Sequence, residues 1–364
     1  LGFYILGRVL FRDRFWAYLL AWLTAMTVDN IGLGEIWGVW QDSLPRVTFQ
    51  SLLPFLLALV FAWKDQPRRW IWLMVFVGAL VYVHPISAPA WGFAVWLGLW
   101  LFHPRTWMPG RRLLVMLGLG GVFLVVLIPF ALNYLSYRGQ DPVQDVGAVL
   151  SILQTYAPVN LFNVPAALGD FLSNMTTSLL IPLGLAGLVF TWFVDRGARR
   201  QVKVVLLWVA GLLITSVIIP WGERLLEARL NILPLETELL RCIRYLVPLL
   251  LIFSLWGLAG WVRRQERKPL RWAGITLGIL LVGFWGATNR PAVGDMLDAA
   301  ACLGRARLVC AEPRPLDELL TSLREQTQPG EGVFFYNQDL SATSQSLSVR
   351  YAGLRPLVYS YRDS

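Results

Sequence analysis

Apolar runs without a single charged residue recur along most of the chain and are separated by short, mostly basic segments. A helix of about 20 predominantly apolar residues crosses the hydrocarbon core of a bilayer, and shorter runs can cross where flanking Trp and Arg reach the interface. The pattern predicts an all-α polytopic transmembrane helix bundle. The nine runs are 15–28, 47–63, 70–84, 88–102, 113–134, 179–194, 204–220, 245–262 and 272–288.

The runs 70–84 and 88–102 are the least regular, because His84-Pro85 and Pro89 interrupt them. One helix across both runs would be about 50 Å long, which is too long for a single crossing. Basic clusters flank the pair at both ends, so the chain must return to the side from which it started. Two short spans joined by a turn are therefore predicted.

The basic residues concentrate in the turns 12–14, 64–69, 103–112, 195–203 and 263–271. The chain has 32 basic and 23 acidic residues. These turns hold 17 of the basic and 4 of the acidic residues, so the rest of the chain has 15 basic and 19 acidic residues. Basic turns stay in the cytoplasm. The net charge of +9 therefore comes from basic turns that alternate with apolar runs. A nucleic-acid-binding protein would instead gather its positive charge on one folded face. Tryptophans at the ends of the runs are expected in the interfacial aromatic belt, namely Trp16, Trp63, Trp70, Trp72, Trp100, Trp107, Trp208 and Trp272.

The predicted organisation is a transmembrane helical domain over 1–288, followed by an external soluble α/β segment over 289–364. Residues 1–11 resemble the end of a further span, so we expect the sequence to be part of a longer protein. The predicted location is the bacterial inner (plasma) membrane, within the cell envelope. The lipid bilayer is the expected partner.

Two external loops, 135–178 and 221–244, are predicted to be amphipathic and not simple linkers. In the first loop, apolar residues at helical spacing predict short amphipathic helices over 143–156 and 164–175, lying in the membrane interface. In the C-terminal segment, 315–326 and 341–352 are predicted helices, whereas 332–337 and 357–361 are predicted strands. This order begins a small α/β domain.

Motifs of soluble enzymes for nucleotide binding, zinc proteolysis or serine hydrolysis do not occur. His84 and His103 are predicted on opposite sides of the membrane, so they cannot share a metal ion. The nine runs carry no ionisable Asp, Glu, Lys or Arg. Ion-coupled transporters need such groups at membrane depth, which disfavours a transporter.

Polar chemistry is therefore expected in the external loops. Asp29, Glu35 and Asp42 form an acidic loop in which a carboxylate can act as a general base or bind a divalent cation; the alternative is a solvated acidic surface. Arg241 and Arg244 lie three residues apart, where two guanidinium groups can bind a lipid-linked phosphate. The alternative is pairing with Glu236 or Glu238.

Three further residues complete the candidates. His84 stands in a helix-breaking turn, where its imidazole can contact a substrate or simply cap a helix. Cys302 and Cys310 lie in the external tail, where an oxidising compartment allows a disulfide between them.

Two segments of the tail carry a resemblance to a known family. LREQTQPGEGVF (323–334) resembles the helix-to-strand opening of the external domain in the polytopic C-type (GT-C) membrane glycosyltransferase superfamily, and RYAGLRPLV (350–358) resembles a later element of that domain. The resemblance implies sugar transfer from a polyprenyl-phosphate-linked donor, with catalytic carboxylates in the first external loop. Asp29 is the substitute candidate for such a carboxylate, with Glu35, His84, Arg241 and Arg244 as candidate substrate contacts.

The first functional hypothesis is therefore a glycosyltransferase-like enzyme on the external face. The alternatives are a non-catalytic membrane protein on the same scaffold, a polysaccharide polymerase or ligase, and, less favoured, a transporter.

Overall fold

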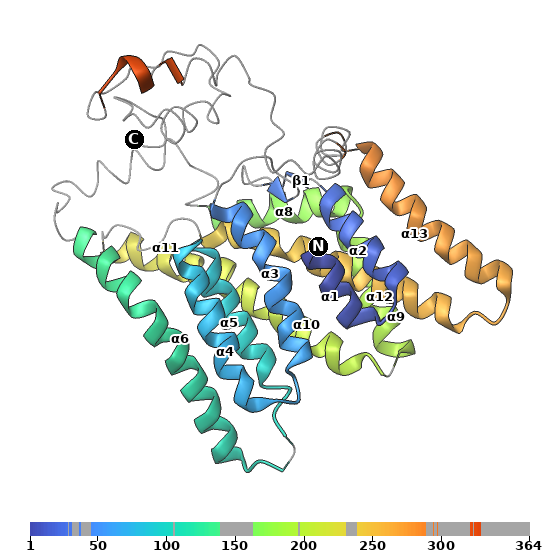
Figure 1. Ribbon diagram of the computed structural model, residues 1–364, viewed down its shortest axis with the longest axis horizontal. Coiled ribbons are helices and arrows are strands. Elements are labelled where there is room, and N and C mark those ends of the chain that lie inside the picture. The colour runs from blue at the N-terminus through green and yellow to red at the C-terminus, as the bar shows by residue number, and fades with distance from the viewer. Residues whose placement is uncertain are drawn as a thin grey trace. The chain divides into compact units, whose positions relative to one another are not determined.

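The structure is a computed structural model (Figure 1). It describes residues 1–27, 45–104, 106–138, 163–195, 197–230 and 239–288, the backbone of two short strands, and the positions 294, 297, 321–322 and 324–328. By contacts the chain divides into two compact units, Leu1–Met296 and Leu297–Ser364. The first unit is helical over almost all of its described residues, as predicted.

The helices and strands of the first unit are α1 (Gly2–Phe11), α2 (Arg14–Met26), β1 (Asp29–Asn30), β2 (Ile36–Trp37), α3 (Pro45–Ala62), η1 (Pro67–Arg69), α4 (Trp70–Ala79), η2 (Leu80–Tyr82), α5 (Ser87–Leu99), α6 (Pro109–Arg138), α8 (Val164–Thr177), α9 (Leu180–Val194), α10 (Arg199–Leu213), the π-helical η4 (Ile214–Ile218), α11 (Ile219–Leu230), the 3₁₀-helical η5 (Leu239–Tyr245), α12 (Leu246–Arg264) and α13 (Lys268–Thr288).

Each of the nine apolar runs overlaps at least one of these helices. Five helical segments of the described residues are long and apolar enough to cross a membrane, and six if the bent pair α8–α9 counts as one span. The helices α2, α4, α5 and α9 have only 10 to 15 residues. At about 1.5 Å per residue they are shorter than a hydrocarbon core of about 30 Å. Helix length thus supports five or six spans and does not confirm nine.

Local sequence explains where several helices begin. The Asp13 carboxylate accepts the backbone N–H groups of Phe15 (2.8 Å) and Trp16 (3.3 Å) at the start of α2. The Asn163 side chain accepts the N–H of Ala166 (3.1 Å) at the start of α8. Such side-chain caps satisfy donors that the first turn of a helix leaves without a partner.

Helix α12 lies at the centre of the first unit. Its most apolar window is 78% buried, compared with 11% for α6 and 22% for α13, which stand at opposite margins in Figure 1. The most extensive helix contact among the described residues joins α12 to α9, where a Cβ on Gly187 would lie 2.2 Å from the Phe253 carbonyl oxygen and one on Gly257 would lie 2.5 Å from the Gly187 Cα. Only glycine permits this approach of two backbones.

Two of the eight tryptophans expected in the aromatic belt are largely exposed, and three are buried in the protein. Trp72 and Trp272 are 62% and 65% exposed, as interfacial residues would be. Trp16, Trp70 and Trp208 are instead buried among the helices, and Trp208 packs edge-on against Trp91. A tryptophan at the end of an apolar run can face either lipid or a neighbouring helix, and periodicity does not distinguish the two.

Helix α8 covers the segment in which 164–175 is predicted to be amphipathic. Val164, Ala167, Phe171 and Met175 are buried on one face, whereas Leu172 is 47% exposed on the other. α8 meets α9 at an angle of 75°. This bend is compatible with an interfacial helix, which stays a prediction. The companion range 143–156 lies outside the described residues.

Little of the C-terminal unit is described. Residues 321–322 and 324–326 are helical, within the helix predicted over 315–326. The second predicted helix and both predicted strands lie outside the described residues, so the α/β segment is not confirmed.

Candidate functional site

A polar cluster joins the N-terminal parts of α3, α5 and α12, away from the basic turns. The Tyr245 hydroxyl donates to the Ser87 Oγ at 2.7 Å, and both side chains are buried. The Ser87 backbone N–H donates to His84 Nδ1 at 3.1 Å. Phe49 of α3 packs against both rings, with centroid distances of 6.2 Å to His84 and 5.8 Å to Tyr245. The cluster therefore ties the turn before α5 to the start of α12.

His84 is a neutral imidazole in this cluster. Burial, and then the positive charge of Arg46 on α3, lower the pKa of His84 from 6.5 to about 4. Because Nδ1 accepts the Ser87 N–H, the ring proton is assigned to Nε2, which remains as the hydrogen-bond donor. His84 thus caps the start of α5, which is one of its two predicted roles.

Arg241 and Arg244 lie on η5, a 3₁₀-helix in which residues three apart eclipse one another. Arg241 is half-buried. Arg244, by contrast, is almost fully buried, with only 2% of its surface exposed. Its guanidinium carbon lies 5.4 Å from the Tyr245 ring centroid, which keeps the group against the cluster. Burial by neighbouring helices could not be foreseen from helical spacing.

The predicted acidic loop is described only in part. Asp29 and Asn30 form β1, which pairs antiparallel with β2 in the register Asp29↔Trp37 and Asn30↔Ile36. The backbone of β2 lies against η5, so the hairpin that carries Asp29 approaches the segment with Arg241 and Arg244. The side chain of Asp29 and the whole of Glu35, Asp42, Glu236 and Glu238 lie outside the described residues.

The candidate residues for a divalent-cation site and for a disulfide lie largely outside the described part of the chain. That part holds no group of three or more His, Cys, Asp or Glu residues placed to bind a metal. Cys302 and Cys310 lie outside it. Cys242 is a buried thiol whose Sγ lies 3.7 Å from the Ile86 carbonyl oxygen, in the same cluster as Tyr245.

Ser87 and Tyr245 were not among the predicted site residues. Ser87 follows the His84-Pro85 turn, and Tyr245 opens an apolar run directly after Arg244. A serine and a tyrosine in apolar segments are signals of a buried hydrogen bond, but 158 residues separate them and nothing in the sequence pairs them.

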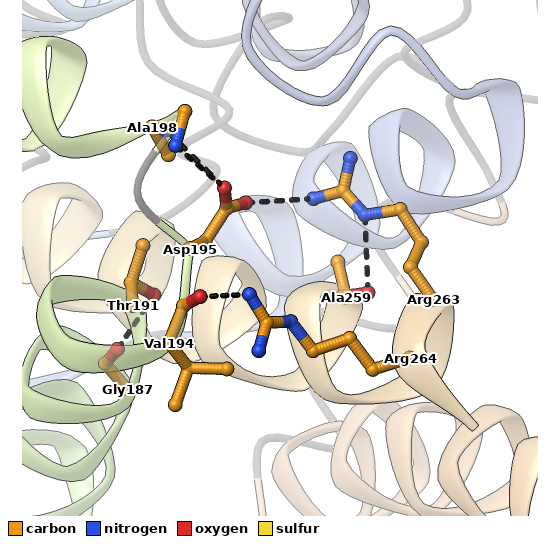
Figure 2. Close-up of polar contacts among 9 residues, drawn as sticks. Gly187, Thr191, Val194, Asp195, Ala198, Ala259, Arg263 and Arg264 are labelled. Atoms are coloured by element: carbon orange, nitrogen blue, oxygen red, sulfur yellow. Dashed lines mark hydrogen bonds and ion pairs between the residues drawn. The ribbon is translucent and has the colours of Figure 1, made fainter.

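A second polar cluster lies at the other end of the helices from His84 and Tyr245, among the basic turns (Figure 2). The Asp195 carboxylate accepts the N–H groups of Gly197 and Ala198 before α10, and lies 3.8 Å from the Arg263 guanidinium. Arg264 donates to the Val194 carbonyl at the end of α9. We call the end of the bundle that carries the basic turns the basic end, and the end that carries His84 and Tyr245 the opposite end.

Several arginines at the basic end bind the carbonyl oxygens that end helices. Arg199 donates to Trp192 O at 2.8 Å, and Arg200 donates to Leu101 O at 3.2 and 2.8 Å. A positive charge near a helix C-terminus is stabilising because the helix dipole is negative there. Four basic side chains also stack on aromatic rings: Arg69 on Trp63, Arg111 on Trp107, Arg200 on Phe102 and Lys203 on Trp192. These basic residues therefore also stabilise the bundle.

No protein-family model matches the chain, and no curated protein or solved structure is similar to it. The glycosyltransferase resemblance therefore stays a prediction based on the tail residues.

Proposed function

We propose that the protein is a polytopic membrane protein that binds a polyprenyl-phosphate-linked sugar at the opposite end and transfers the sugar, as a glycosyltransferase of the C-type architecture does. The observation that carries the proposal is the gathering of Arg46, His84, Arg241 and Arg244 at one end of the helices, beside the hairpin that holds Asp29.

The directions of packed helices support alternating crossings. On α9 and α12 the contacts Gly184–Leu250 and Gly187–Phe253 progress together toward Val194–Arg264, so the two helices are parallel. On α5 and α10 the contacts run in opposite order, from Ala94–Gly211 to Leu101–Arg200. A bundle of nine alternating spans with the basic end in the cytoplasm requires these two directions.

The charge at the opposite end suits an anionic headgroup. Half-buried Arg241 is the proposed direct contact, because a guanidinium binds phosphate oxygens through two charge-assisted hydrogen bonds. Buried Arg244 adds positive potential from beneath, and Nε2 of neutral His84 adds a donor without adding charge. The Asp29 carboxylate is the proposed general base for the sugar acceptor.

A binding assay with polyprenyl phosphate tests the site. The full chain in lipid nanodiscs is titrated with the phosphate, and the Arg241→Gln and Arg241→Gln/Arg244→Gln variants are compared with Arg199→Gln, which removes one arginine from the basic end. We expect affinity to fall by about tenfold or more in the first two and to stay unchanged in the third. Equal affinity in all four proteins would overturn the site.

A transfer assay separates catalysis from binding. The Asp29→Asn variant is expected to bind polyprenyl phosphate as the wild type does but to release no sugar from a labelled lipid-linked donor. Undiminished release would reject Asp29 as the base. Binding without release by the wild type, over a panel of donors, would favour the alternative of a non-catalytic protein on this scaffold.

A further inference from the structure

The turn from α12 into α13 presents a concentrated positive charge. Residues 263–271 hold five basic residues and one acidic residue, Glu266. The side chains of Arg267, Lys268 and Arg271 are exposed, and Trp272 beside them is 65% exposed. We call Arg267, Lys268, Arg271 and Trp272 the α13 patch.

The basic residues of this segment divide into two groups. Arg263 and Arg264 are exposed but engaged within the protein, where they contact Asp195, the Ala259 carbonyl and the Val194 carbonyl (Figure 2). Within the described residues, the side chains of Arg267, Lys268 and Arg271 make no ion pair or hydrogen bond. The nearby Asp195 carboxylate is already engaged by Arg263 and the start of α10, so the charge of the α13 patch is directed outward.

The patch heads an exposed apolar stripe. Lys268, Arg271 and Trp272 share a face of α13, because residues three and four apart are neighbours on a helix. Ile279 continues this face and Leu280 flanks it, with side chains that are 53% and 61% exposed. The stripe from Trp272 to Leu280 spans roughly 12 Å at 1.5 Å per residue, which is long enough to contact the part of an acyl chain nearest its headgroup.

We propose that the α13 patch is a binding surface for anionic phospholipid of the surrounding bilayer. The three cations bind the phosphodiester headgroup, Trp272 lies at headgroup depth, and the acyl chains follow the stripe of α13. The first turn of α13 contains no acidic residue, so nothing within the helix offsets this charge. A zwitterionic lipid fits less well, because its own ammonium group is repelled.

The test uses the full chain in mixed micelles, titrated separately with phosphatidylglycerol and phosphatidylcholine of equal chain length, with bound lipids counted by native mass spectrometry. The patch variant is Arg267→Gln/Lys268→Gln/Arg271→Gln. The matched control is Lys64→Gln/Arg68→Gln/Arg69→Gln, which removes three cations from another turn of the basic end. A charge-retaining variant, Arg267→Lys/Arg271→Lys, separates loss of charge from misfolding.

The wild type is expected to prefer phosphatidylglycerol, and the patch variant to lose at least about fivefold of that preference. The control and the charge-retaining variant should keep the preference within about twofold, and added salt should weaken it in the wild type. The proposal is overturned if the wild type has no preference, if the patch variant keeps it, or if the patch and control variants lose it equally. The site at the opposite end is not touched by these variants, so this result is independent of the proposed function.

Discussion

The opposite end of the bundle contains a buried hydrogen-bonded group made of His84, Ser87 and Tyr245. A buried hydroxyl needs a partner because its transfer out of water is costly, and the Tyr245–Ser87 bond provides one for both residues. His84 in turn satisfies the first backbone donor of α5. Each group is therefore neutral and paired beneath the arginines.

Two replacements of His84 should separate the stability that comes from capping α5 from the stability that depends on protonation of the imidazole. Since the pKa is lowered to about 4 in the folded protein, the unfolded chain binds a proton that the folded chain excludes between pH 6.5 and 4. Stability should therefore fall as the pH falls through this window. His84→Asn, which keeps a capping oxygen, should match the wild type at pH 7.5 and show a smaller fall toward pH 4.

His84→Ala should instead be less stable at both pH values, by about 1 kcal/mol at pH 7.5 from the lost cap. Thermal unfolding in detergent at pH 7.5 and pH 4.5 measures these differences. An unchanged pH dependence in His84→Asn would contradict the titration of His84.

The hydroxyl pair can be measured by a double-mutant cycle. Tyr245→Phe should lower the free energy of unfolding by about 1 to 2 kcal/mol, because it leaves the Ser87 hydroxyl buried without this partner. Ser87→Ala should cost less, because the Tyr245 hydroxyl keeps its hydrogen bond with Arg244. The double variant should cost less than the sum by about 1 kcal/mol. Additive costs would mean that the 2.7 Å contact does not contribute.

At the scale of elements, glycines determine which helices pack most closely. Gly187 on α9 and Gly257 on α12 bring two parallel backbones together, whereas a Cβ added at Gly118 on α6 would meet nothing within 4 Å. Both sites are glycines within apolar helices, so the sequence alone treats them alike. The difference arises from the neighbouring helix.

Gly187→Ala and Gly118→Ala form a matched pair. The first should destabilise the protein by about 2 kcal/mol or more, because the added methyl group meets the Phe253 backbone at 2.2 Å. The second should be neutral or stabilising by up to about 1 kcal/mol, because alanine favours a helix over glycine. Unfolding of both variants under the same detergent conditions decides the point, and equal effects would exclude the close α9–α12 contact.

Sequence reasoning located the helices because lipid-compatible runs and their charged boundaries are local properties of the chain. Arg241, Arg244 and His84 were selected as candidates from their place beside apolar runs. The partners Ser87 and Tyr245, the burial of Arg244 and the core position of Trp208 were missed, because each depends on which helices become neighbours. The number of spans is likewise undecided by composition, since α4 and α5 are apolar but short.

At the scale of the whole molecule, two ends with different chemistry follow from one asymmetric charge distribution. At the basic end, arginines bind helix carbonyls and Asp195, and the α13 patch remains directed outward. At the opposite end, fewer cations gather around buried hydroxyl groups and a neutral histidine. The proposed sugar-transfer site requires the opposite end to face outward from the cell, and the lipid-binding patch requires the basic end to lie at the inner leaflet.

Cysteine accessibility in intact cells tests this sidedness most directly. The native Cys242, Cys302 and Cys310 are replaced by alanine, and single cysteines are introduced at the exposed positions Pro85 and Glu266, in the turns at the two ends. We predict that a membrane-impermeant maleimide labels position 85 in intact cells and labels position 266 only after permeabilisation. Labelling of position 266 in intact cells, or protection of position 85 until permeabilisation, would contradict the account.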